Sequence, residues 1–440
     1  MSSLIVEVCE VKDVRKHPNA DRLEICIVKG WNVVIQKGQF VAGDKCVYIP
    51  YDAVLPPELA NGPTDVPPGR LNVVKYCAPL AKLENGVRPP GCRVRAARLR
   101  GERSFGIMMK IDPAWGDDPN WSVGTDVAAH FGITKWSPPE NCEDGDADTP
   151  HPRFHEHTQI QKIQEFPTVF KDGEEVVFTE KIHGKNNRLG LILDRDDSGN
   201  AMWSWTAGSH EIRRKEHAPI MARFDAAKLA EDGLLANTSV QVDQQFKDRG
   251  GRFWKVTELR PTEDERVLFK ATRIHEDGTP CFKRSEFWTF MTDAVRALML
   301  HLRDKYDWPE PKNDIVVFGE LFGYGVQTME YGRKALDYRV FDIAINGKYL
   351  DFDTKVRLLD QFGVQMVPVL YRGPFSMTEV NKYTDGPTTM CAPEEAGSFK
   401  GREGIVITPA KERWSEELNG RVILKSVSVD YLGSDQSDNR

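Results

Sequence analysis

One acidic, proline-rich segment divides this chain of 440 residues into two parts of different character. The segment runs from Trp136 to Phe154, reads WSPPENCEDGDADTPHPRF and has no hydrophobic periodicity. Such a composition is typical of a solvated linker, because it offers little apolar surface to a packed core. We therefore predict a first domain over residues 1–135, a linker over 136–154 and a second domain over 155–440, which agrees with roughly 150 residues per domain.

Short runs of β-forming residues dominate the first domain. Turn signals such as Lys37–Gly38 and Gly43–Asp44 separate these runs. The runs lie at residues 4–9, 23–28, 31–35 and 45–49. Closely spaced strands without long helices favour a small barrel, and we predict an OB-like fold.

The second domain alternates strand-like and helical stretches. Residues 175–178 and 188–193 are strand-like, and the clearest helix is expected over residues 286–304 because apolar side chains recur there at helical spacing. These side chains are Phe287, Phe290, Met291, Val295, Leu298 and Leu302. The sequence therefore predicts an α+β protein in which a β-barrel precedes a mixed domain.

The overall charge excludes one class of function. The chain has 59 Lys and Arg against 66 Asp and Glu, a net charge of −7, so it is not a polycation that coats nucleic acid without preference. No apolar run approaches the roughly 18 residues of a membrane span, and the eight cysteines form no C-x2-C pair. We expect reduced thiols, no membrane contact and a soluble protein of the cytoplasm or nucleus.

The most reactive candidate lies where a predicted strand ends, in the segment FTEKIHGKNN from Phe178 to Asn187. The chain has neither a GxxxxGK[ST] nor a GxGxxG loop, so a bound nucleotide would need another anchor. Lys181 stands three residues before Gly184, at a strand end that holds it rigidly. Partial desolvation or a neighbouring cation can lower the pKa of a lysine from about 10.4 and supply a neutral amine nucleophile.

The tetrad Lys181-Ile-His-Gly184 resembles the K-x-[DH]-G motif of the covalent nucleotidyltransferases, which comprise DNA ligases, RNA ligases and mRNA capping enzymes. Further segments resemble the other motifs of that family, in the same order and at plausible spacing. They are Ser209–His210, Ile315–Gly323 with Glu320, Tyr338–Ile343 with Phe341, Gly401–Ile407 with Glu403, and Arg421–Val427 with Lys425. Such an ordered set arises by chance much more rarely than any one motif.

The chain departs from the family pattern at two positions. His210 stands where the family usually has an arginine that contacts phosphate, so this role falls to His210, Arg213 or Arg214. Ile423 replaces the first lysine of the usual K-x-K pattern, and only Lys425 carries over.

Three features resemble one group within that family. His183 and Asn186 in the first motif look like RNA ligases, and the OB-like domain comes first rather than last. This order resembles the fifth family of ATP-dependent RNA ligases. The resemblance implies that an ATP-grasp-like nucleotidyltransferase domain of antiparallel sheets and helices follows the OB domain.

The resemblance also implies a reaction in three steps, and a role in RNA repair. Lys181 attacks the α-phosphorus of ATP to form a lysine-linked AMP, the AMP passes to an RNA 5′-phosphate, and a 3′-hydroxyl displaces it. Lys425 offsets the developing charge, and Glu320 and Glu403 help to hold Mg²⁺ or Mn²⁺. The nucleotide-binding set is Glu180, Lys181, Asn186, Glu320, Phe341, Glu403 and Lys425.

RNA ends are the expected partners, and no obligate protein partner is inferred. A basic cluster in the first domain could follow RNA phosphates. It consists of Arg93, Arg95, Arg98, Arg100 and Arg103.

Two other functions stay open at this point. One is a DNA ligase or a GTP-dependent capping-type enzyme. The other is a non-catalytic RNA-binding protein with a degenerate ligase domain, which the departures at His210 and Ile423 would favour. Retention of Lys181, Glu320 and Glu403 together argues against the second.

Overall fold

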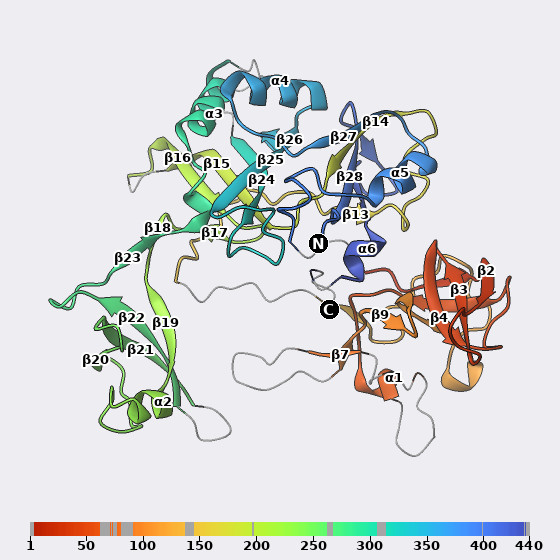
Figure 1. Ribbon diagram of the computed structural model, residues 1–440. Helices are drawn as coiled ribbons and strands as arrows, with labels where there is room; N and C mark the ends of the chain where they lie inside the picture. The colour runs from red at the N-terminus through yellow and green to blue at the C-terminus, as the bar shows by residue number, and fades with distance from the viewer. Residues whose placement is uncertain are drawn as a thin grey trace.

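The computed structural model describes residues 4–61, 71, 73, 77–80, 91–136, 145–195, 198–261, 267–305, 314–397, 399–434 and 436. Figure 1 shows a strand-rich N-terminal domain beside a larger α+β domain, from which a smaller strand-rich unit projects. None of the helices in these ranges is both long and apolar enough to cross a membrane.

The N-terminal domain is built from short antiparallel strands, as expected for an OB fold. One sheet has the order β1 (Glu7–Glu10), β5 (Lys45–Ile49), β11 (Ile107–Met109), and another the order β2 (Asp13–Lys16), β3 (Leu23–Val28), β4 (Trp31–Gln36). Lys29 and Gly30 join β3 to β4 and both have positive φ, at 50° and 79°. Two such residues form the tight hairpin turn that matches the twist of a β-ribbon.

The rest of this domain closes the barrel and its ends. Its elements are β6 (Ala53–Leu55), α1 (Pro57–Asn61), β7 (Ala78–Pro79), β8 (Cys92–Arg93), β9 (Ala96–Leu99), β10 (Glu102–Phe105), the 3-10 helix η2 (Pro113–Trp115) and β12 (Thr134–Lys135).

Two sheets of mostly antiparallel strands form the centre of the second domain. The first has the order β13 (Gln161–Lys162), β31 (Leu424–Val427), β28 (Gly404–Pro409), β14 (Glu175–Glu180), β27 (Val369–Pro374). The second has the order β17 (Arg213–Arg214), β16 (Ala201–Gly208), β15 (Lys185–Arg195), β24 (Ile315–Gly323), β25 (Leu336–Ile345), β26 (Lys348–Tyr349). A short hairpin pairs β29 (Trp414–Ser415) with β30 (Gly420–Arg421).

Helices cover the outer faces of these sheets. The helices α3 (Asp293–Lys305) and α4 (Phe352–Phe362) share an apolar core with the second sheet, and α5 (Met377–Thr384) packs on the first. The helix predicted over 286–304 begins later than expected. Residues Glu286–Trp288 form a 3-10 turn, η3, and the backbone N–H of Val295 bonds to the Thr292 hydroxyl at 3.4 Å, which marks the true helix start.

Sequence reasoning missed the unit that projects from this domain. It contains β19 (Met221–Asp225), α2 (Ala226–Glu231), β20 (Gln245–Lys247), β21 (Phe253–Pro261) and β22 (Val267–Ile274). These elements bury an apolar core of their own, which includes Phe246, Trp254 and Phe269. A two-stranded ribbon of β18 (His217–Pro219) and β23 (Phe282–Arg284) joins this insert to the main body (Figure 1).

The two domains share one apolar core. It combines Trp31 and Tyr48 of the barrel with Tyr431 and Leu432 of the short helix α6 (Val429–Leu432). Arg103 reinforces this junction, because its guanidinium donates to the Val429 carbonyl at 2.6 Å and to the Asp430 carboxylate at 2.7 Å. The barrel therefore packs directly against the last helix of the second domain.

The second half of the predicted linker is packed rather than solvated. Asp146 is buried, and its carboxylate accepts hydrogen bonds from Arg214 at 2.6 Å and from the Ser285 hydroxyl at 3.2 Å. Phe154 is buried with the Arg188 guanidinium 4.3 Å from its ring centroid. These partners lie far away in sequence, so composition could not indicate them. Residues 137–144 of the linker lie outside the described residues.

Candidate active site

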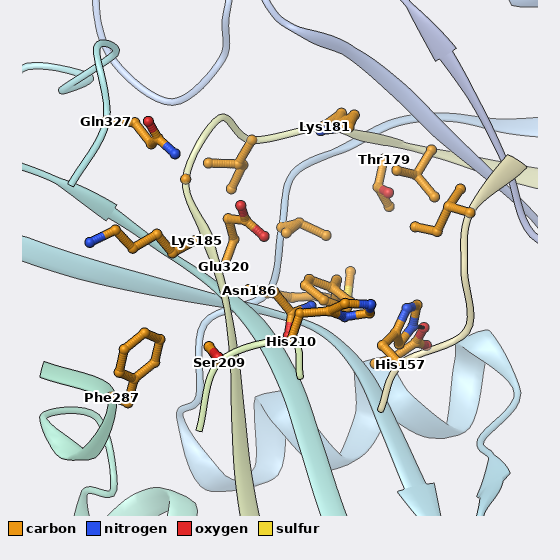
Figure 2. Close-up of a pocket in the computed structure, with 18 of the residues that line it drawn as sticks. His157, Thr179, Lys181, Lys185, Asn186, Ser209, His210, Phe287, Glu320 and Gln327 are labelled. Atoms are coloured by element: carbon orange, nitrogen blue, oxygen red, sulfur yellow. Dashed lines mark hydrogen bonds and ion pairs between the residues drawn. The ribbon is translucent and has the colours of Figure 1, made fainter. Parts of the chain in front are cut away.

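A cavity of about 870 Å³ opens between the two sheets of the second domain. Strands β14, β28 and β31 of the first sheet and β15, β24 and β25 of the second contribute side chains to its walls. Figure 2 shows Lys181 above Glu320 and Asn186, with His210 and His157 below them. The structure thus brings together residues from all six segments that resemble nucleotidyltransferase motifs.

Backbone contacts fix the position of Lys181, which directly follows the end of strand β14. The Lys181 N–H donates to the Gly404 carbonyl at 3.0 Å, which joins the end of β14 to the start of β28. Gly404 has φ of +151°, and a Cβ there would stand 2.1 Å from the Ser426 carbonyl oxygen. A Cβ on Gly184 would stand 2.3 Å from the Leu321 carbonyl oxygen. Both glycines are needed because neighbouring strands approach them too closely for any side chain.

Lys181, which lines the cavity, forms an ion pair with Glu403. Its Nζ lies 2.5 Å from Oε1 of Glu403, and the lysine side chain is 25% exposed while the glutamate is 11% exposed. Burial opposes ionisation of this carboxyl, but Lys181 and His183 outweigh it and hold the pKa of Glu403 at about 2. Glu403 is therefore a carboxylate at neutral pH.

His183 links this pair to the C-terminal helix. Its Nδ1 lies 3.7 Å from Oε2 of Glu403 and 3.1 Å from the Tyr431 hydroxyl, and its Nε2 lies 3.2 Å from the Thr328 hydroxyl. Because Tyr431 also belongs to the core shared with the barrel, the position of Glu403 is coupled to the contact between the domains.

Glu320 presents a second carboxyl group beside this pair. Burial raises the pKa of Glu320 to about 8, the Lys181 ammonium opposes this shift, and the Glu403 carboxylate adds to it. The negative charge on either carboxylate makes ionisation of the other less favourable. A bound divalent cation would offset this repulsion.

Lys425 faces the same cavity from β31. Burial, together with the neighbouring Lys181 and Lys162 ammonium groups, lowers the pKa of Lys425 to about 7. Ile423, which replaces the usual first lysine, is buried and also lines the cavity. Lys162 lies beside Lys425 in register across β13 and β31, but it contacts the Tyr51 ring of the barrel at 3.7 Å and is absent from the lining.

Asn186 and Phe341 also line the cavity, as the motifs led us to expect. The Asn186 side-chain oxygen is buried without a hydrogen-bond partner, so it is available to a bound ligand. The Phe341 ring contacts the His157 ring edge-on, with centroids 5.0 Å apart.

A buried charged network behind Phe341 was not foreseen. Asp342 accepts bonds from Lys355 at 2.9 Å and Arg421 at 2.7 Å, and lies 2.7 Å from Nε2 of His157. Burial opposes ionisation, but Arg421 and Lys355 hold the pKa of Asp342 well below its usual value. The Lys355 ammonium also donates to the Phe341 carbonyl at 2.6 Å, so the network fixes the aromatic residue. The only sequence signal was that Asp342 directly follows Phe341.

Glu180 differs from its expected role. Its carboxylate accepts bonds from both hydroxyls of Thr388 and Thr389, at 2.5 and 2.6 Å, and from the Thr389 N–H at 2.8 Å. Glu180 belongs to the cavity wall, but this carboxylate is already satisfied within the protein. It holds the 388–389 segment rather than presenting a free acceptor to a nucleotide or 5′-phosphate.

The three candidates for the missing arginine have different environments. His210 lines the cavity, and burial lowers the pKa of His210 to about 4, so it is neutral at pH 7. Arg214 lines the cavity but pairs with the buried Asp146. Arg213 lies outside the lining and donates to the Thr206 hydroxyl at 3.0 Å.

The arginine cluster of the barrel is not one uniform patch. Arg93 is buried against Asp52 at 2.6 Å with its guanidinium 3.4 Å from the Trp136 ring centroid, and Arg103 is part of the domain junction. Both guanidinium groups are therefore engaged within the protein, and their contact with RNA stays a prediction. Arg95 is half-buried, whereas Arg98 and Arg100 are exposed and remain candidates for contact with RNA.

Comparison with known proteins identifies the family. A family model described as RNA ligase matches residues 174–427, more than half of the chain, so this protein belongs to the RNA ligase family. A second model, described as an OB-fold domain, matches residues 5–61. The predicted order of an OB domain before a ligase domain is confirmed. A search of curated protein sequences finds no significant match.

Solved structures of Naegleria gruberi RNA ligase share the fold over the whole chain. A mutant of that enzyme with ATP and Mn is 20% identical, covers 99% of this chain and 100% of its own, and superposes with a TM-score of 0.62. An apo mutant of the same enzyme covers 98% of both chains with a TM-score of 0.61, again at 20% identity. The enzyme with PPi also covers 98% of both chains, with 20% identity and a TM-score of 0.60.

Proposed function

We propose that this protein is an ATP-dependent RNA ligase that joins a 3′-hydroxyl to a 5′-phosphate through a Lys181–AMP intermediate. The observation that carries the proposal is the pairing of Lys181 with Glu403 at 2.5 Å in a cavity that also contains Glu320 and Lys425. Membership of the RNA ligase family and the ATP bound by the Naegleria gruberi enzyme support the choice of substrates.

The first step is an in-line displacement at the α-phosphorus of ATP. The Lys181 amine forms the N–P bond while the P–O bond to pyrophosphate breaks, and the nitrogen loses its proton to water, because the Glu403 carboxylate with its pKa of about 2 is too weak a base. Lys425 offsets the negative charge that develops on the phosphoryl oxygens. Phe341 stacks on the base, and Asn186 supplies its unpartnered oxygen to the nucleoside.

The carboxyl groups present fit a divalent cation that completes its coordination with phosphate and water. Within the described residues, no three His, Cys, Asp or Glu side chains converge on one point, so an all-protein metal site is absent there. Mg²⁺ and Mn²⁺ need only one or two carboxylates when a nucleotide is present, and Glu320 and Glu403 provide them. Such an ion neutralises phosphate charge, and Mn accompanies ATP in the Naegleria gruberi enzyme.

The later steps act on RNA. The AMP moves from Lys181 to an RNA 5′-phosphate, and a 3′-hydroxyl then displaces it to seal the strand. The exposed Arg98 and Arg100 of the barrel contribute to RNA binding. We place this activity in RNA repair inside the cell, which the seven free cysteines among the described residues support.

Covalent labelling tests the proposal directly. Incubation with α-labelled ATP should leave a label on the denatured protein, GTP should leave none, and Lys181→Ala should remove the label entirely. A second assay compares nicked RNA with nicked DNA and should show sealing of RNA. Labelling that survives Lys181→Ala would refute the mechanism, and preference for GTP or for DNA would indicate a capping enzyme or a DNA ligase.

A further inference from the structure

The ribbon that carries the insert has an unusual surface. All three residues of β23 (Phe282, Lys283 and Arg284) are exposed, and the Phe282 side chain is 58% exposed. They pair with Pro219, Ala218 and His217 of β18 in antiparallel register. Alternation along the strands places Phe282 and Arg284 on the same face, with His217 opposite Arg284. An exposed aromatic ring therefore lies on the same face as Arg284, and Lys283 lies on the other face of the narrow ribbon.

This ribbon continues directly into the wall of the active-site cavity. Lys283 and Arg284 line the cavity, as do Ser285, Glu286 and Phe287 immediately after them. Lys185, four residues beyond the proposed nucleophile, pairs with Glu286 at 2.9 Å. Figure 2 shows Lys185 and Phe287 on the same side of the cavity. The ribbon thus extends the cavity on the side of β15.

The ribbon supplies cations where the cavity lacks them. Ile423 and the neutral His210 replace two of the cations that the family pattern provides, and Arg214 is neutralised by Asp146. Lys185, Lys283 and Arg284 add three cations to the cavity lining. Lys185 pairs with Glu286 and Arg284 with Glu216, whose side chains are 35% and 38% exposed, so phosphate can compete for these two cations in water.

Both ends of the ribbon are held in place. At the far end, the Ile220 N–H donates to the Cys281 carbonyl at 2.9 Å, and the Arg273 N–H donates to the Ile220 carbonyl at 2.7 Å. At the cavity end, the Ser285 N–H donates to the Glu216 carbonyl at 2.8 Å. The insert, with its own core, thereby presents the ribbon as a preformed surface, and a preformed surface loses little entropy on binding.

We propose that the β18–β23 ribbon binds the single-stranded RNA segment adjacent to the end that is being joined. Phe282 stacks on a base, Arg284 on the same face contacts the neighbouring phosphate, and Lys283, on the other face, contacts phosphate from the cavity lining. The proposal rests on the RNA ligase function above. An exposed aromatic ring beside a cation is the combination that recognises single-stranded nucleic acid without reading its sequence. Because the ribbon continues into the cavity wall, RNA bound on it would lead directly to the proposed active site.

RNA binding is measured by the fluorescence anisotropy of a labelled, 5′-phosphorylated RNA oligonucleotide, which requires no catalysis. We expect Lys283→Ala/Arg284→Ala to weaken affinity about tenfold and to reduce the dependence of log affinity on log salt by about one unit. Phe282→Leu should weaken affinity about tenfold as well, whereas Phe282→Tyr should retain it, because only an aromatic ring stacks. Lys247→Ala/Arg249→Ala is the matched control, since these cations lie on the same insert outside the cavity lining.

Covalent AMP formation by the Phe282→Leu variant separates the two proposals. We expect labelling within about twofold of the native rate, because Phe282 lies outside the cavity lining. Ribbon variants that bind RNA as tightly as the native protein, with an unchanged salt slope, would overturn the ribbon proposal alone. Equal weakening in the Lys247→Ala/Arg249→Ala control would also overturn it. A native protein that forms no lysine–AMP would instead refute the proposed function.

Discussion

The arginine segment of the barrel and the cavity of the ligase domain both concentrate cations, but they use them differently. In the barrel, Arg93 and Arg103 form structural ion pairs with Asp52 and Asp430. In the cavity, Lys181 and Lys425 lie beside carboxyl groups that a nucleotide and metal could displace. A dense run of arginines in the sequence is therefore a weaker indication of ligand binding than these two lysines, although more than half of the chain separates them. The counter-charges decide which cations are available to a ligand.

The largest effect is expected from removing the counter-charge of Lys181. Glu403→Gln should slow covalent AMP formation about 100-fold, a typical loss for one preorganised electrostatic group in an active site. Single-turnover labelling with ATP measures it. The control is Glu379→Gln, which changes a half-buried helix carboxylate outside the cavity lining that pairs with Lys382 at 3.1 Å. A Glu403→Gln rate close to native would mean that the pair has no role in catalysis.

Arg93→Ala tests whether the barrel arginine is structural. Loss of the buried partner of Asp52 should lower the free energy of unfolding by about 2 kcal/mol, less than a fully buried pair because the Asp52 side chain is 24% exposed. Urea unfolding of the full chain measures the change. Arg100→Ala, at an exposed position, should stay within about 0.5 kcal/mol of native. Equal stability of the two variants would contradict the contrast between buried and exposed arginines.

Lys425 should make nucleotide binding depend on pH. Its pKa is lowered to about 7, so the ammonium is present below pH 7 and is lost as the pH rises through that value. We expect the half-saturating ATP concentration to rise about tenfold between roughly pH 6 and pH 8.5. Lys425→Arg should flatten this dependence, because a guanidinium stays charged. An unchanged pH profile in Lys425→Arg would show that another group is responsible.

The smallest effect is expected from the exposed part of the barrel cluster. Arg98→Ala/Arg100→Ala should weaken RNA binding about threefold and leave covalent AMP formation unchanged, since exposed phosphate contacts contribute little individually. RNA anisotropy at two salt concentrations measures the change. If affinity and salt slope both stay native, the barrel cluster has no part in RNA binding, and the ribbon becomes the main cationic surface.

Local sequence patterns were sufficient for the features that depend on neighbours in the chain. The strands of the barrel, the strand that ends at Lys181 and the glycine at 184 all follow from alternation and turn chemistry within a few residues. The ordered motifs also predicted which side chains would meet: Lys181, Glu320 and Lys425 line one cavity, and Glu403 pairs with Lys181. Their catalytic roles stay predictions that the labelling experiments address.

Features that depend on distant partners could not be read in this way. Asp146 belongs to a segment that is acidic and proline-rich, yet Arg214 and Ser285 bury it. The helix expected from 286 begins at Asp293, because the residues before it turn to form the cavity wall. The insert from β19 to β22 was not apparent, since short strands with a small core have no long periodicity.

The sequence by itself determined the order of the domains and the family, and it singled out Lys181 as the predicted nucleophile. Those properties depend on short motifs, whose residue types and order can be read without the tertiary structure. Only the tertiary structure decided how the charges are paired and placed: it paired Arg93 with Asp52, fixed Phe341 through Lys355 and Asp342, and placed Lys283 and Arg284 in the cavity lining. The reason is physical. Burial and long-range pairing set the energy of each charge, and neither is encoded in the residues next to it.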